Sequence, residues 1–179
     1  MNALCDVTAS TLILVDLQTR LMPAIHDGQA VASRAAILAR AAKLLDVPIV
    51  ATEQSPASLG HTVSQLQELC DTTIAKSHFD ASTEAAFIDS LAPQRDELIV
   101  AGCEAHVCVM QTVLGLLERD YRVWLVTDAI GSRHPHDLKA AIDRAGATGA
   151  RLVTTEMVIF EWMRDSHHPA FKSLLELVK

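Results

Sequence analysis

The stretch ELIVAGCEAHVCVMQTVLGLLERD, residues 97–120, decides the fold class of this chain. Residues 97–102 form a continuous apolar run, which is typical of a strand covered on both faces, and residues 107–120 have the apolar spacing of a helix. A strand that leads directly into a helix is half of a βαβ unit and predicts a parallel sheet. Two thiols, Cys103 and Cys108, lie at this junction, where they are either ordinary core residues or part of a reactive site.

The same alternation of apolar runs and helical patterns continues in both directions from this stretch. We predict strands over residues 11–16, 48–52, 72–76, 97–102, 122–128 and 151–155, and helices over 31–46, 82–92, 107–120 and 136–150. The region after residue 156 carries one or two further helices. The chain has no linker, repeat or low-complexity tract. We therefore predict one domain over residues 1–179, an α/β protein with a doubly wound, six-stranded parallel sheet in a three-layer α/β/α sandwich of the Rossmann-like kind.

Composition narrows the classes of partner. The chain has 179 residues, of which 50% are hydrophobic, and no apolar run approaches the roughly 18 residues of a membrane span. A net charge of −7 argues against a nucleic-acid partner, so we expect a small-molecule substrate. The first residues lack the basic segment of a signal peptide, and four cysteines without C-x-x-C spacing fit a reducing compartment. We expect a cytoplasmic protein.

Three polar residues at the ends of the predicted strands are candidates for chemistry. Asp16 ends the first strand, Lys76 ends the third, and Cys108 begins the helix after the fourth. Ligands of open parallel sheets bind beyond the carboxyl ends of the strands, where these residues fall. Each also has a simpler interpretation: Asp16 as a cap of a nearby turn, Lys76 as a lysine that reaches solvent, and Cys108 as a small buried apolar residue.

The three residue types together fit nucleophilic catalysis. A free thiol has a pKa of about 8.5, so only a small fraction is thiolate at neutral pH. A helix N-terminus stabilises an adjacent anion by roughly 0.3 to 1 kcal/mol, which is less than one pKa unit. An ammonium near the sulfur and a carboxylate that accepts its proton would supply the remainder, and these are the roles that Lys76 and Asp16 could have.

The motifs that contain these residues resemble the isochorismatase-like cysteine hydrolase superfamily. The similarity lies in LILVDLQ around Asp16, AKSHFDA around Lys76, IVAGCEAHVCV around Cys108, and VTDAIGSR after the fifth strand. Two further segments, ATEQSPASLGHTV and the ending HPAFKSLLELVK, resemble the isochorismatase-domain-containing branch. The resemblance covers nearly the whole chain and its motifs occur in the family's order.

The resemblance implies a sheet of order 3-2-1-4-5-6 and a catalytic triad. In it Asp16 is the general base, Lys76 orients Asp16 and stabilises the thiolate, and Cys108 attacks an electrophilic carbon, usually that of an amide. It also implies a cis peptide bond between Cys103 and Glu104. The backbone N–H groups of Glu104 and Cys108 would then form the oxyanion hole.

Departures from other branches of this family bear on the chemistry. The nicotinamidase branch has a metal-binding D-x-H motif where this chain has TEQSPASLGH, so we expect no catalytic metal and no cofactor. Enol-ether-cleaving isochorismatases do not depend on a cysteine, so Cys108 favours hydrolysis of a C–N or acyl bond. We expect Leu59, Phe79 and His106 to line the substrate pocket, and a homo-oligomer.

Two other functions compete with this hypothesis. The chain is alternatively a binding or scaffolding member of the fold whose activity is incidental, or an enol-ether hydrolase of the isochorismatase type. A nucleotide-dependent oxidoreductase is disfavoured because no G-x-G-x-x-G motif follows the first strand.

Overall fold

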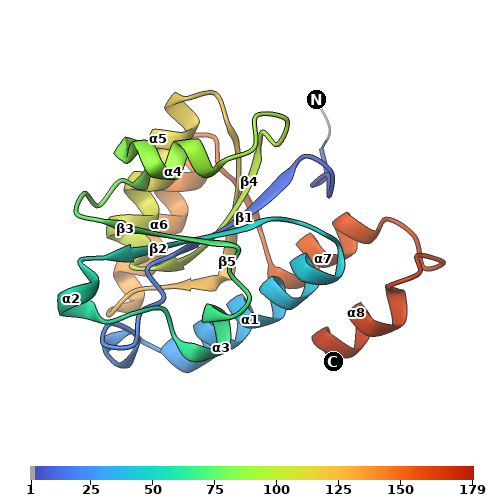
Figure 1. Ribbon diagram of the computed structural model, residues 1–179, viewed down its shortest axis with the longest axis horizontal. Coiled ribbons are helices and arrows are strands. Elements are labelled where there is room, and N and C mark those ends of the chain that lie inside the picture. Colours follow the sequence, from blue (N-terminus) through green and yellow to red (C-terminus); the bar gives the residue numbers. More distant parts are fainter. Residues whose placement is uncertain (1–2) are drawn as a thin grey trace.

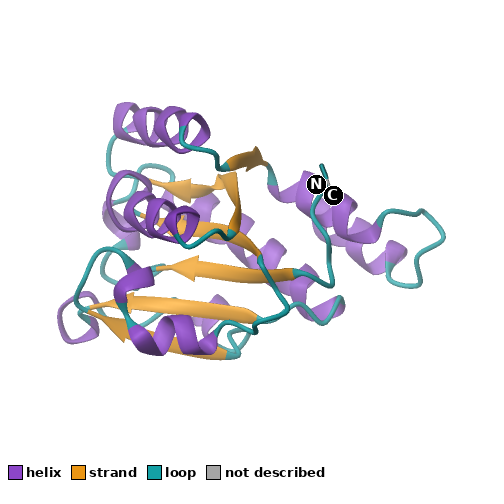
Figure 2. Ribbon diagram, turned by 90° about the horizontal axis from the view of Figure 1, so that it is seen from above, coloured by secondary structure: helices purple, strands orange, loops and turns teal. Residues whose placement is uncertain are grey.

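The computed structural model describes residues 3–179, which form a six-stranded parallel sheet between two layers of helices (Figures 1 and 2). The strands are β1 (Ser10–Val15), β2 (Ile49–Gln54), β3 (Thr72–Lys76), β4 (Glu97–Cys103), β5 (Arg122–Gly131) and β6 (Arg151–Val153). Their order across the sheet is β3-β2-β1-β4-β5-β6. The predicted fold class and strand order are both confirmed. Strands β2 and β3 follow β1 toward one edge of the sheet, whereas β5 and β6 follow β4 toward the other. Strands β1 and β4 therefore lie side by side at the point where the direction of the crossovers reverses.

The helices divide between the two faces of the sheet. They are α1 (Gly28–Leu44), α2 (Pro56–Leu59), α3 (Ser64–Gln67), α4 (Ala85–Ser90), α5 (Met110–Glu118), α6 (Pro135–Ala147), α7 (Thr155–Met163) and α8 (Phe171–Val178). Helix α1 packs with α3, α7 and α8 on one face, and α5 packs with α6 on the other. Figure 1 shows α4 on the same side of the sheet as α5 and α6.

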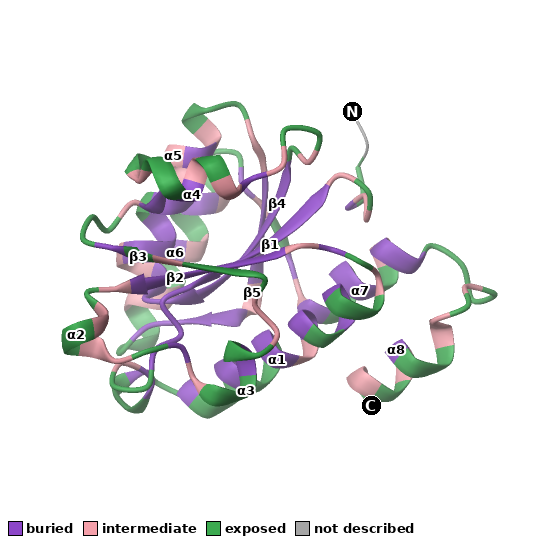
Figure 3. Cartoon of the chain, viewed as in Figure 1, coloured by how far each residue is buried: buried purple, intermediate pink, exposed green. Residues whose placement is uncertain are grey.

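Alternation of side chains along the strands creates two cores. Leu12 and Leu14 of β1 join the core beneath α1, whereas Ile13 and Val15 join the core beneath α5 and α6. Because both faces are covered, the central strands are apolar at nearly every position, which explains the continuous runs in the sequence. Figure 3 shows these buried strands between the exposed outer surfaces of the helices. None of the helices within residues 3–179 is long and apolar enough to cross a membrane.

Several expected elements differ from the observed ones at their boundaries. The strand predicted over 151–155 ends at Val153, because the hydroxyl of Thr154 accepts a hydrogen bond from the N–H of Met157 and begins α7 instead. The helix predicted over 82–92 is a 3-10 turn at 81–83 followed by the short α4. Its first cap is Asp80, whose carboxylate accepts from the N–H of Ser82 at 2.7 Å.

The helix predicted over 107–120 begins earlier and in a wider form. Residues 105–109 form one turn of π-helix, and α5 continues from Met110 to Glu118. Cys108 lies in the π-helical turn, which directly follows the carboxyl end of β4. The wider turn therefore sets the position of the thiol relative to the end of the sheet.

Candidate active site

Asp16 directly follows the carboxyl end of β1, and hydrogen bonds to both of its carboxylate oxygens hold its side chain in place. Its φ of 50° lies in the left-handed region, which Asp tolerates better than most residues. The residue is fully buried. Its Oδ1 accepts a hydrogen bond from the hydroxyl of Thr52 at 2.7 Å, and its Oδ2 accepts one from Lys76 Nζ at 2.8 Å. Asp16 is thus a paired buried carboxylate and not the cap of a turn.

Lys76 turns its ammonium inward from the end of the edge strand β3. Besides Asp16, Nζ donates to Oε1 of Gln54 at 2.7 Å and approaches the carbonyl oxygens of His78 and Phe79 at 3.3 and 3.5 Å. None of the Lys76 side chain is exposed. A buried ammonium requires such partners, because an unpaired charge in a low-dielectric site is strongly disfavoured. The interpretation of Lys76 as a solvent-reaching lysine is therefore wrong.

Cys108 lies close enough to this ion pair for both charges to act on its thiol. Burial raises the pKa of Cys108 to about 12, and the charge of Asp16 and a hydrogen bond with it act in the same direction. Lys76 lowers this pKa by its charge and by a hydrogen bond. The balance leaves the resting thiol protonated at neutral pH. The chemistry available to it therefore requires a base that removes the proton during attack, and Asp16 is the adjacent carboxylate.

Gly102 allows β4 to approach β1 closely at this point. A Cβ atom at Gly102 would lie 2.0 Å from the carbonyl oxygen of Val15, and the φ of Gly102 is +131°. No other residue type fits both the space and the backbone conformation. The glycine of the opening stretch thereby brings the turn that carries Cys108 next to Asp16.

The turn between Cys103 and Cys108 is fastened to the end of β5. The peptide bond between Cys103 and Glu104 is cis. The carboxylate of Glu104 accepts hydrogen bonds from the Nε of Arg133 at 3.0 and 3.1 Å and from its backbone N–H at 3.1 Å. His106 Nδ1 lies 2.9 Å from the hydroxyl of Ser132. These contacts fix the backbone of the turn from which the predicted oxyanion hole would be built.

The three predicted pocket residues do not line one hollow. Phe79 lies on the wall of a depression of about 500 Å³, and His106 lines a separate one of about 120 Å³ against α6. Leu59 lines neither of them. The larger depression is formed by residues from the loop after β3 and from the first turn of α5, which are Ser77, His78, Phe79, Asp80, Thr83 and Gln111.

The histidines near the sheet end are exposed, and each is paired with a carboxylate. His61 Nδ1 lies 3.0 Å from Glu53, and His78 Nδ1 lies 2.9 Å from Glu84. Across residues 3–179, no three His, Cys, Asp or Glu side chains gather in a group that could hold a metal ion. The side chains of His61 and His78 are 72% and 67% exposed, as expected for histidines of surface turns.

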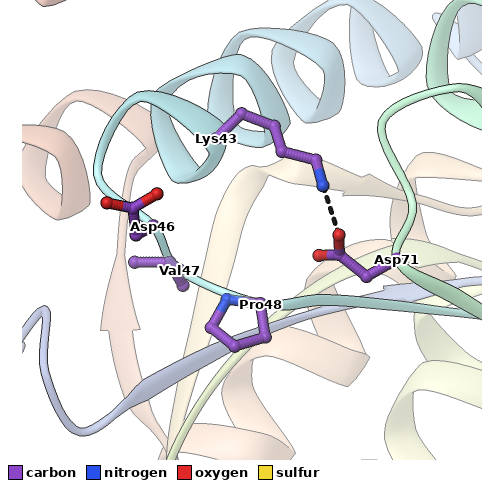
Figure 4. A pocket seen from close by; sticks show the side chains of 5 residues that line it. All are labelled: Lys43, Asp46, Val47, Pro48 and Asp71. Atoms are coloured by element: carbon purple, nitrogen blue, oxygen red, sulfur yellow. Dashed lines mark hydrogen bonds and ion pairs between the residues drawn. The ribbon is translucent and has the colours of Figure 1, made fainter.

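Another hollow lies at the opposite end of the sheet, distant from Asp16, Lys76 and Cys108. Figure 4 shows it between the end of α1 and the amino ends of β2 and β3, with Lys43 paired to Asp71 across it. Its volume is about 280 Å³. Because ligands of parallel sheets bind at the carboxyl ends, we place the candidate site at Asp16, Lys76 and Cys108.

Two glutamines and a threonine in the site were not predicted. Gln54 holds Lys76, Thr52 holds Asp16, and the fully buried Gln18 accepts from the N–H of Gln54 at 2.8 Å through Oε1. Gln54 ends β2 as Lys76 ends β3, so the rule that singled out polar residues at strand ends also applies to it. Thr52 is the last residue of the strand predicted over 48–52, so the same rule could have found it, whereas Gln18 carries no comparable signal in the sequence.

The fold and site define a class: a doubly wound α/β protein with a buried carboxylate, ammonium and thiol at the point where the crossovers reverse. The isochorismatase domain family matches residues 10–157, and the chain belongs to this family. Isochorismatase domain-containing protein 2A of Mus musculus is 35% identical over 171 residues, which cover 96% of this chain and 83% of that protein.

Solved structures show the same fold over nearly the whole chain. The MAR1 ribonuclease of Caenorhabditis elegans superposes with a TM-score of 0.93 at 36% identity and covers 98% of this chain and 92% of its own. YcaC of Pseudomonas aeruginosa, solved with hexane-2,5-diol and covalent acrylamide, has a TM-score of 0.92 at 25% identity, covering 99% of this chain and 92% of its own.

Proposed function

We propose that this chain is a metal-independent cysteine hydrolase that cleaves a small amide, or a related C–N or acyl bond, through a covalent intermediate on Cys108. One observation carries the proposal: the Asp16 and Lys76 ion pair is completely buried, and both members act on the thiol of Cys108. A buried ion pair contributes little to stability in comparison with apolar packing, so its presence beside a thiol favours a chemical role.

In the first half of the reaction, the thiol of Cys108 attacks the substrate carbonyl while Asp16 accepts its proton. The ammonium of Lys76, paired with Asp16, limits the accumulation of negative charge around the sulfur. The backbone N–H groups of Glu104 and Cys108 would donate to the tetrahedral oxyanion, an interaction that contributes on the order of 3 kcal/mol per donor. Asp16 then returns its proton to the departing nitrogen, the C–N bond breaks, and a thioester on Cys108 remains.

In the second half, water replaces the amine. Asp16 takes a proton from the water molecule as its oxygen attacks the thioester carbonyl, and the new tetrahedral intermediate is stabilised by the same N–H groups. When the C–S bond breaks, the proton passes from Asp16 to the sulfur and the carboxylic acid is released. Each proton removed by Asp16 is thus returned, and the site regains its resting state.

A relative supports the nucleophilic step. YcaC of Pseudomonas aeruginosa was solved with covalent acrylamide, and acrylamide is an electrophile that reacts with nucleophilic side chains such as thiolates. That protein is 25% identical to this chain over nearly its whole length, and its covalent acrylamide supports a reactive nucleophile at this site.

The experiment that tests this function is a screen of small amides and acyl esters with the parent chain and Cys108→Ala. We expect release of amine or alcohol by the parent and none by the variant. With a hydrolysable substrate, a thioester on Cys108 should be trapped by rapid acid quenching and located by mass spectrometry. Turnover that survives in Cys108→Ala would contradict the proposal, and absence of turnover across the library would favour a binding or scaffolding role.

A second candidate function is hydrolysis of RNA, because one relative at 36% identity is described as a ribonuclease. The net charge of −7 disfavours binding of a polyanion at physiological salt. We therefore expect labelled RNA to remain intact with the parent chain. Cleavage that is lost in Cys108→Ala would assign RNA to this site, whereas equal cleavage by both proteins would indicate a contaminating nuclease.

We also propose that the chain acts as a homo-oligomer. Large apolar side chains are exposed at several positions near β6 and α7, including Leu152, Met157 and Phe160 with 39 to 45% of their surface exposed. Met157 and Phe160 are three residues apart on α7 and so share one face of that helix, and neighbouring exposed apolar side chains are typical of surfaces that contact another copy. Light scattering during size-exclusion chromatography gives the mass directly, and a monomer at micromolar concentration would contradict the proposal.

A further inference from the structure

Gln54 makes a contact with Lys76 that is as short as the contact made by Asp16. Its Oε1 accepts from Nζ at 2.7 Å, compared with 2.8 Å for Oδ2 of Asp16. The other end of the amide donates through Nε2 to the carbonyl oxygen of Ser77 at 2.8 Å. Since a carbonyl oxygen cannot donate, this second bond requires the amide oxygen of Gln54 to face the ammonium.

Gln18 fixes the backbone that carries this amide. Its Oε1 accepts from the N–H of Gln54 at 2.8 Å, while its Nε2 donates to the carbonyl oxygens of Gln54 at 3.1 Å and Gly60 at 2.6 Å. Gln18 is fully buried. The position of Gln54 is therefore set by main-chain bonds that do not depend on its own side chain, and replacement of that side chain should leave them in place.

The neutrality of Gln54 matters because the charges of the site are already balanced. An ammonium has three protons, and its two shortest acceptors here are one carboxylate and one amide. The charged groups that act on the pKa of Cys108 are Asp16, at the end of β1, and Lys76, at the end of β3. The pKa of the neighbouring thiol of Cys103, in β4, is raised in part by Cys108. A second carboxylate on Lys76 would leave this cluster with a net negative charge.

We infer that Gln54 is a positioning residue of this site, one that holds the Lys76 ammonium beside Cys108 without cancelling its charge. The inference rests on the proposed function and deepens it, because Gln54 acts on the sulfur through Lys76 and does not itself touch the thiol. A carboxylate here would bind the ammonium as well but would oppose thiolate formation. An apolar side chain would remove one of the two shortest acceptors of the buried ammonium, which would then be held beside the sulfur by Asp16 and by the longer contacts to the carbonyl oxygens of His78 and Phe79.

The test compares the alkylation of Cys108 by two reagents of similar size, neutral iodoacetamide and anionic iodoacetate. Rates are followed by peptide mass spectrometry from pH 6 to 9 in the parent, Gln54→Met and Gln54→Glu. The ratio of the iodoacetate rate to the iodoacetamide rate reports the local charge and cancels differences in access. We expect this ratio to fall several-fold in Gln54→Met and by about tenfold or more in Gln54→Glu, since a like charge within a few ångströms repels the anionic reagent.

Gln94→Glu is the matched control. It introduces the same charge in the exposed loop before β4, at the amino end of the strands and so at the opposite end of the sheet from Cys108, and should leave the ratio unchanged. Circular dichroism and thermal unfolding establish that each variant is folded. A folded Gln54→Met with the parent's ratio overturns the inference; if that variant does not fold, a parent-like ratio in Gln54→Glu overturns it.

Failure of the proposed function gives a different result. It would appear as a parent Cys108 that reacts no faster than Cys70, whose thiol is less buried and whose pKa burial raises to about 11. The comparison of ratios between parent and Gln54 variants can still be made at such slow rates. The two proposals are therefore judged by separate measurements in the same experiment.

Discussion

The Nζ atom of Lys76 lies 2.8 Å from Oδ2 of Asp16, and neither side chain has any surface exposed to solvent. Removal of one partner leaves the other charge buried and unpaired. We expect Lys76→Met to lower the free energy of unfolding by about 3 to 5 kcal/mol, and the double variant with Asp16→Asn to lose less than the sum of the single changes. Urea unfolding at pH 7 measures each value. Additive losses would show that the two groups do not interact in solution.

The order in which the four cysteines are alkylated tests the role of Asp16 as a base. Burial raises the pKa of Cys70 to about 11 and that of Cys108 to about 12, so thiolate content alone predicts that Cys70 reacts first. We expect Cys108 to react first at pH 7, because Asp16 accepts its proton during attack. Cys103 and Cys5 are fully buried and should react last.

The matched variant for this order is Asp16→Asn, which keeps the size of the side chain but removes the base. In that variant Cys108 should fall behind Cys70, while the rate at Cys70 should not change. Peptide mapping after limited reaction with iodoacetamide gives all four rates in one sample. An unchanged rate at Cys108 in Asp16→Asn would remove Asp16 from the proton transfer.

The close approach at Gly102 predicts a severe effect of Gly102→Ala. The added Cβ would meet the Val15 carbonyl oxygen at 2.0 Å, and backbone rather than a flexible side chain would have to move. We expect the free energy of unfolding to fall by more than about 4 kcal/mol, or the variant to fail to fold.

Gly149→Ala is the control, because Gly149 also has a positive φ, +108°, but nothing lies within 4 Å of its Cβ position. Its cost should be roughly 1 to 2 kcal/mol, the value of backbone conformation alone. Similar melting temperatures for the two variants would contradict the steric argument.

Glu53 gives the protein a specific dependence of stability on acid. Burial disfavours its charged form, but hydrogen bonds from the N–H of Thr62, from His61 and from the hydroxyl of Thr62 outweigh burial, and the pKa of Glu53 is lowered. A carboxyl group with a lower pKa in the folded state contributes stability above its unfolded pKa of about 4.5, and that contribution is lost as the pH falls through the folded value.

We therefore expect Glu53→Gln to be less stable than the parent at pH 7 and to approach it as the pH falls from about 5 to 3. Urea unfolding at a series of pH values measures the difference. Parallel stability curves for parent and variant over this range would show that Glu53 does not titrate with folding.

The sequence predicts the sheet and the placement of the candidate site well, for a physical reason. Strands covered on both faces must be apolar, so a polar residue such as Asp16 or Lys76 at the end of one is conspicuous. It also predicts that these two residues and Cys108 share one end of the sheet. The pairing of Lys76 with Asp16, and not with solvent, required the structure, because a flexible side chain can point either way.

Other features depend on contacts that no local pattern carries. Gln18 is fully buried and joins β1, β2 and the turn at Gly60, yet glutamine is common on surfaces and its identity alone gives no warning of this. The direction of the pKa shift of Cys108 was also not predictable. The residue types suggested a thiolate stabilised by Lys76, whereas burial in the folded chain dominates and keeps the thiol protonated.

Strand β3 lies at the edge of the sheet and is bonded to β2 alone, and its residues are largely exposed except Lys76. One of the two edge strands of the sheet thus delivers the cation, while the innermost strands lead to the carboxylate and the thiol. Opening of this edge would withdraw the ammonium while leaving the remaining strands intact. The rate of hydrogen exchange at the β3 amides should therefore set an upper limit on the time for which the assembled site persists. A partner that added a strand to this edge would lengthen that time.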